Sequence, residues 1–91
     1  MRLTVEDIQK CLDNEKAQEA IDVSLRILEE DKTNDRVYYL LGNAYRKMGD
    51  WQNAINNYLQ AMELNPESPA RQAYEMANDI LNFFNKDMYN Q

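Results

Sequence analysis

The chain repeats itself with a period of 34 residues, and this repeat constrains its fold more than any other feature. Shifting the sequence by 34 positions brings similar residues into register: Ala20 with Ala54, Ile21 with Ile55, Leu25 with Leu59, Leu28 with Met62 and Glu29 with Glu63. The 91 residues therefore divide into units of 34, 34 and 23. Such a period indicates a helix-turn-helix unit that cannot bury its apolar face alone and must stack on neighbours.

Apolar residues recur at helical spacing in five segments of the chain. The predicted helices run from Val5 to Leu12, Ala17 to Leu28, Val37 to Met48, Trp51 to Leu64 and Pro69 to about Phe84. We expect Thr4, Asp35 and Ser68 to be the N-caps of the first, third and fifth helices. Pro66 ends the fourth helix, because proline disfavours helical geometry at the residue before it.

The second unit carries a recognisable pattern of residues. Its members are Tyr38, Leu41, Gly42, Tyr45, Ala54, Tyr58 and Pro66. Residues 35–68 thereby resemble the tetratricopeptide repeat (TPR) family. Residues 1–34 are similar to a divergent repeat, residues 69–84 resemble the helix that closes such arrays, and residues 85–91 form a tail. The resemblance implies one all-α domain over residues 1–91, in which five helices form antiparallel hairpins stacked as a short solenoid.

Composition argues against catalysis, metal binding and nucleic-acid binding. The chain has 16 acidic and 10 basic residues, no histidine and one cysteine, giving a net charge of −6. Most catalytic and metal sites lack their usual side chains here, so we expect no enzyme, no metal and no cofactor. The acidic excess disfavours phosphate backbones. The longest apolar run, Val37 to Leu41, is five residues, and acidic residues follow the N-terminus closely, so we expect a cytoplasmic protein without a membrane segment.

The resemblance implies that the protein binds a peptide or protein segment along a concave groove, which the first helix of each repeat would line. On the third helix, five residues fall within about 100° of one face at the α-helical 100° per residue. They are Arg36, Tyr39, Asn43, Arg46 and Lys47. Three cations on one face favour an acidic segment, and these five residues are the predicted partner-binding site. The alternative is a helix face that is only solvated.

A more specific resemblance, to the TPR proteins that grip a chaperone's C-terminal carboxylate, is disfavoured. Those proteins need lysine, arginine and asparagine at fixed positions of successive helices. Here the positions hold Val5, Gln9, Leu40, Ala70 and Tyr74. Starting one repeat later retains Asn43 but places tyrosine where lysine is required.

The apolar stripe of the fifth helix is rotated from the register that the family implies. It contains Ala70, Ala73, Tyr74, Ala77, Ile80, Leu81 and Phe84. Either the helix turns on its axis and buries this stripe against the third and fourth helices, or the stripe faces the groove or solvent. In the second case Ile80, Leu81, Phe84 and Met88 would form a self-association surface. The alternative function is then that of a structural protein that forms a homodimer or larger homo-oligomer.

Overall fold

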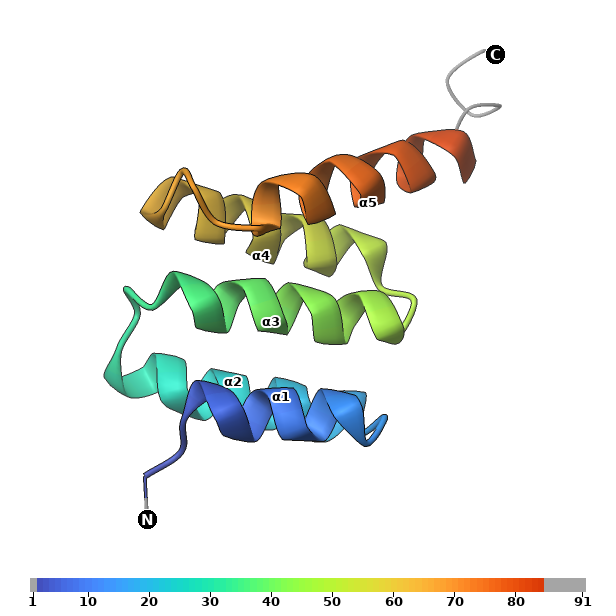
Figure 1. The fold of residues 1–91 in the computed structure, drawn as a ribbon. Coiled ribbons are helices and arrows are strands. Elements are labelled where there is room, and N and C mark those ends of the chain that lie inside the picture. Colours follow the sequence, from blue (N-terminus) through green and yellow to red (C-terminus); the bar gives the residue numbers. More distant parts are fainter. Residues whose placement is uncertain (1, 85–91) are drawn as a thin grey trace.

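Five helices make up the part of the chain that the computed structural model describes, residues 2–84 (Figure 1). They are α1 (Val5–Asp13), α2 (Ala17–Glu30), α3 (Asp35–Lys47), α4 (Trp51–Leu64) and α5 (Ala70–Phe84). These residues contain no strand, and the predicted all-α fold is confirmed. Within the same residues, no helix has the length and apolar character to span a membrane.

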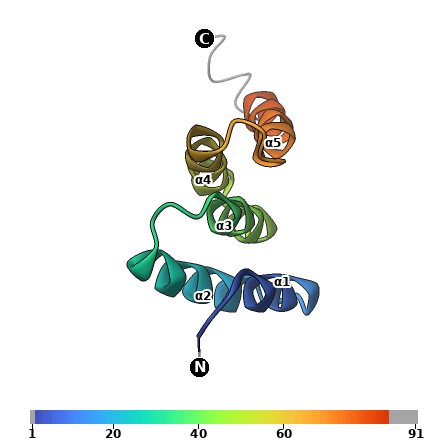
Figure 2. The ribbon, with the colours of Figure 1, turned by 60° about the vertical axis from the view of Figure 1, so that its left-hand side comes forward.

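The helices stack as antiparallel hairpins. Figure 2 shows α1, α3 and α5 along one side of the stack, with α2 and α4 along the other. α3 lies at the centre, where it contacts α1, α2 and α4, and α5 packs on α4 at the end of the stack (Figure 1). α1, α3 and α5 therefore lie on the same side of the stack.

Side chains at the helix starts satisfy backbone N–H groups that have no partner within the helix. Before α1, the Thr4 backbone N–H donates to the Asp7 carboxylate at 2.8 Å. Before α5, Ser68 Oγ accepts the Ala70 N–H at 3.1 Å. Thr4 is the N-cap of α1, as the sequence predicts, and Ser68 has the hydrogen bond of an N-cap.

The predicted N-cap of α3 is wrong by one residue. Asn34 occupies that position, and its Oδ1 accepts the Arg36 N–H at 3.1 Å. Asp35 is instead the first residue of the helix, where its negative charge favours the positive end of the helix dipole. Adjacent Asn and Asp carry equivalent acceptor oxygens, so the sequence does not distinguish which of them caps the helix.

The two hairpins turn in the same way. In the first, the Lys16 N–H donates to the Cys11 carbonyl at 2.8 Å, and in the second the Asp50 N–H donates to the Tyr45 carbonyl at 2.9 Å. Each turn contains one residue in the left-handed region, Gly49 with φ 79° and its 34-residue equivalent Glu15 with φ 59°. Glycine adopts this conformation freely, whereas glutamate has to bear a steric cost there.

The buried apolar side chains form two clusters. The α1–α3 cluster contains Ile8, Leu12, Ala20, Ile21, Leu28, Val37, Leu40, Leu41 and Ala44. The α4–α5 cluster contains Ala54, Ile55, Tyr58, Ala61, Ala70 and Ala77. Tyr38, Tyr39 and Tyr45 of α3 pack against both clusters and thereby join them into one core.

α3 and α4 approach each other most closely at Gly42. A Cβ atom built there would lie 2.5 Å from Cε1 of Tyr58 and 3.1 Å from the Ala54 carbonyl oxygen. Tyr58 is 0% exposed and Gly42 is buried, so neither can move toward solvent without opening the core. A residue without a side chain is therefore required at position 42.

The rotated stripe of α5 packs against the rest of the domain. Ala70 and Ala77 are 0% exposed, and Ala73, Tyr74 and Leu81 pack against the α4–α5 cluster, which tyrosines of α3 also contact. Ile80 is half-buried. Of the predicted self-association residues, Leu81 thus lies against the core, while the side chain of Phe84 and the whole of Met88 fall outside the described residues.

Substituting Gly42→Ala tests the contact between α3 and α4. We expect the free energy of unfolding to fall by about 1–3 kcal/mol, because the new methyl group overpacks against Tyr58, and this exceeds the gain of about 1 kcal/mol in helix propensity. Urea unfolding measures the change. In a Tyr58→Leu background the cost should shrink, and an unchanged cost in that double-mutant cycle would contradict the assignment to Tyr58.

Substituting Glu15→Gly tests the turn of the first hairpin. We expect the free energy of unfolding to rise by about 0.5–1 kcal/mol, since the relief of left-handed strain outweighs the extra entropy of glycine in the unfolded chain. Thermal unfolding measures this difference. The neighbouring Asn14, with φ −94°, is the control, because Asn14→Gly relieves no strain and should destabilise the protein.

Candidate binding groove

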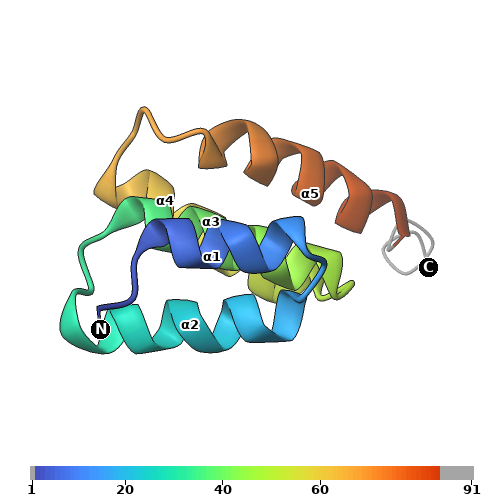
Figure 3. The ribbon, with the colours of Figure 1, turned by 60° about the horizontal axis from the view of Figure 1, so that its bottom comes forward.

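A hollow of about 430 Å³ opens between α1, the start of α3 and the connection into α5. We call it the α1–α3–α5 groove. Its lining residues are Val5, Glu6, Gln9, Asp35, Arg36, Tyr39, Leu40, Asn65, Ser68 and Pro69. Figure 3 shows the first turns of α1, α3 and α5 at the same side of the molecule, because each helix starts at an equivalent point of the repeat.

The apolar part of the groove centres on Tyr39. Its ring lies 6.2 Å from that of Tyr58, centroid to centroid, at an interplanar angle of 41°. This tilted contact fixes one side of the Tyr39 ring, and the half-buried residue offers the rest to the groove. Val5, Leu40 and Pro69 complete the apolar surface that a ligand side chain could contact.

The polar part of the groove carries charges of both signs. Arg36 and Glu6 are exposed, and Asp35 is half-buried. Asn65 Nδ2 donates to Asp35 Oδ2 at 3.2 Å, which ties the end of α4 to the start of α3. The groove can therefore pair a ligand carboxylate with Arg36, while two carboxylates of its own stand nearby.

Asn43 lies about two turns beyond Arg36 on α3 and already has a partner within the chain. The Tyr58 Oη donates to Asn43 Oδ1 at 2.6 Å. Burial raises the pKa of Tyr58 to about 12, an effect that the positive charge of Arg46 opposes and that Tyr39 reinforces. The Asn43 carbonyl oxygen thus satisfies a buried hydroxyl, and its amide NH₂ group is the part that a ligand could use.

Comparison with known proteins agrees with this architecture. Residues 36–68 match the sequence profile of the tetratricopeptide repeat. The solution NMR structure of the Bacteroides fragilis protein BF1650 is similar to the whole chain, with a TM-score of 0.85 and 49% sequence identity over 97% of this chain and 90% of that one. The chain belongs to the tetratricopeptide repeat family. TPR repeats generally mediate protein–protein interactions and are typically non-catalytic. A comparison with curated proteins gave no match.

The α1–α3–α5 groove contains two of the five partner-binding residues that the sequence predicts. Arg36 and Tyr39 line it, while Asn43, Arg46 and Lys47 do not. Lys47 instead lines a separate hollow of about 530 Å³ beside the first hairpin turn. The predicted residues are too far apart along α3 to line one hollow. Arg36 and Lys47 are separated by eleven residues, or roughly 16 Å along the helix axis at 1.5 Å per residue.

Sequence reasoning missed eight of the ten residues that line the groove. The missed residues are Val5, Glu6 and Gln9 of α1, Asp35 and Leu40 of α3, and Asn65, Ser68 and Pro69 before α5. The 34-residue repeat could have predicted that the connection before α5 lines the groove, because Pro69 is the repeat equivalent of Asp35. Equivalent positions of adjacent TPR units become neighbours when the units stack.

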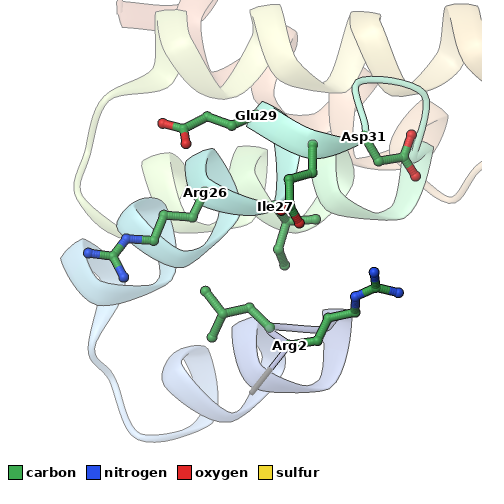
Figure 4. Close-up of a pocket in the computed structure, with 7 residues that line it drawn as sticks. Arg2, Arg26, Ile27, Glu29 and Asp31 are labelled. Atoms are coloured by element: carbon green, nitrogen blue, oxygen red, sulfur yellow. The ribbon is translucent and has the colours of Figure 1, made fainter.

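A larger hollow of about 800 Å³ lies between the residues before α1 and the end of α2 (Figure 4). Its polar groups do not converge, because Arg2 and Arg26 direct their guanidinium groups away from each other. Asp31 is engaged with the Thr33 hydroxyl at 2.7 Å and the Thr33 N–H at 3.0 Å, and these hydrogen bonds lower its pKa. Residues 2–84 also contain no group of three or more His, Cys, Asp or Glu able to hold a metal ion.

The buried hydroxyl of Tyr58 predicts how stability depends on alkaline pH. The folded state keeps this phenol protonated to about pH 12, whereas its ordinary pKa is 10.0. Its contribution to the free energy of unfolding is therefore complete below pH 10 and is lost as the pH rises toward 12. Urea unfolding across this range should show the loss in the wild type and a smaller loss in Tyr58→Phe. An identical pH dependence for the two proteins would contradict this assignment.

Proposed function

We propose that this TPR domain is a non-catalytic interaction module that binds a peptide segment of another protein in the α1–α3–α5 groove. The observation that carries the proposal is that a single hollow, formed by α1, the start of α3 and the connection into α5, contains both Tyr39 and Arg36. A peptide segment lying in this hollow would meet an apolar contact and a charged contact within a single recognition site.

The chemistry of the groove favours a segment with one apolar side chain next to one carboxylate. The apolar side chain would pack on Tyr39, Val5 and Leu40, and the carboxylate would pair with Arg36. Glu6 and Asp35 would repel further acidic groups, so a long acidic run fits less well than a single acid. The acidic partner that the sequence indicates is thereby narrowed to one acidic residue beside an apolar anchor.

Selection from a random heptapeptide phage library tests this specificity directly. The wild type should enrich peptides in which an apolar residue neighbours Asp or Glu, since both parts of the groove contribute to recognition. Tyr39→Ala should weaken the binding of these peptides by about tenfold or more, as expected when a contact worth about 1.4 kcal/mol is lost. Isothermal titration calorimetry with the enriched peptides measures the change.

The second variant reverses the charge of Arg36. The matched control reverses the charge of Arg46. Arg36→Glu should shift the enriched peptides from Asp or Glu toward Lys or Arg, and binding to the wild type should weaken as salt is added. Arg46→Glu changes the charge equally on the same helix but outside the groove, so it should leave the selection unchanged. Equal effects of the two reversals would reject the groove as the binding site.

A further inference from the structure

α5 carries an apolar stripe beside the face that packs on the domain, and the two overlap at Ala73, which also packs against the α4–α5 cluster. Ala73, Met76, Ile80 and Phe83 follow one another at spacings of three, four and three residues. This is the a and d pattern of two heptads, which places all four side chains along one narrow stripe. We call this stripe the α5 seam.

Part of the seam is accessible to solvent. Met76 is 57% exposed and Ala73 and Ile80 are half-buried. Phe83 is 73% exposed although it also takes part in an interaction within the chain. Ala70 and Ala77 lie on the adjacent face and are 0% exposed against α4, so α5 cannot turn the seam inward without uncovering them. Figure 1 shows α5 at the end of the stack, with its outer side away from the other helices.

The order of residues in the seam makes it complementary to itself. A twofold axis at position 78, with two copies of α5 antiparallel, sets Ala73 opposite Phe83 of the second copy. The same axis sets Met76 opposite Ile80, so the smallest residue faces the largest and the two of middle size face each other. A parallel pairing would instead set alanine on alanine and phenylalanine on phenylalanine. We propose that α5 pairs antiparallel with α5 of a second copy of this chain through the α5 seam.

Charge and size predict that the dimer is weak. Asp79 lies beside the seam one residue from the twofold axis, so the two copies bring their Asp79 carboxylates near each other. Each chain also carries a net charge of −6. A contact between two helices of 15 residues lies at the low end of interface sizes, below about 1,200 Å². Added salt should strengthen this association by screening the repulsion, which is the opposite of its expected effect on the groove.

Sedimentation equilibrium up to about 1 mM protein tests the association, a concentration that detects millimolar affinity. The wild type should form a reversible dimer, and Met76→Glu should raise the dissociation constant by about tenfold or more, equivalent to about 1.4 kcal/mol. Met48→Glu is the matched control, because Met48 is 53% exposed on a different surface and should leave the dimer unchanged. Circular dichroism establishes that both variants stay folded. A wild type that remains monomeric, or equal losses in the two variants, would overturn the proposal.

Cross-linking tests the orientation. In a Cys11→Ala background, Met76→Cys and Ile80→Cys proteins are mixed and oxidised. The antiparallel register favours disulfides between the two different variants, whereas a parallel register favours disulfides between identical chains. A preference for identical chains would overturn the antiparallel pairing. Asp79→Asn should strengthen the dimer, and an unchanged or weaker dimer in this variant would count equally against the proposed register.

Discussion

The packing of Tyr58 against Gly42 is the contact on which the rest of the structure depends. It brings α4 so close to α3 that a single added carbon would collide with the tyrosine ring. The same ring contacts Tyr39, and its hydroxyl donates to Asn43. One buried side chain therefore sets the separation of two helices and the orientation of two residues on the face of α3 that borders the groove.

This contact links stability to recognition. The tyrosines of α3 pack on both apolar clusters, so the helix that supplies much of the groove is also the helix that joins the two halves of the core. The core packed behind this helix would limit the ordering cost of the proposed ligand binding. The same arrangement means that a substitution at Tyr39 also removes a contact of the buried Tyr58.

Much of the fold could be predicted because local patterns specify it. The 34-residue repeat and the helical spacing of apolar residues predict all five helices, and the family resemblance supplies their stacking order. The site was harder, because the predicted set followed one face of a single helix. The groove instead lies between α1, the start of α3 and the connection into α5. Lys47 is therefore too far along α3 to reach it, whereas Glu6 of α1 and Asn65 before α5 line it.

By itself the sequence determined the repeat and the helices, because both follow from the periodicity of its residues. Tertiary structure alone decided which polar residues meet, as in the bond between Asn65 and Asp35 across 30 positions of the chain. It also decided which faces of α5 are covered, burying Ala77 and leaving Met76 exposed one residue away. The physical reason is that a helix with apolar residues around much of its circumference can rotate about its axis by a modest angle without losing its own hydrogen bonds. Only packing against the neighbouring helix selects that angle.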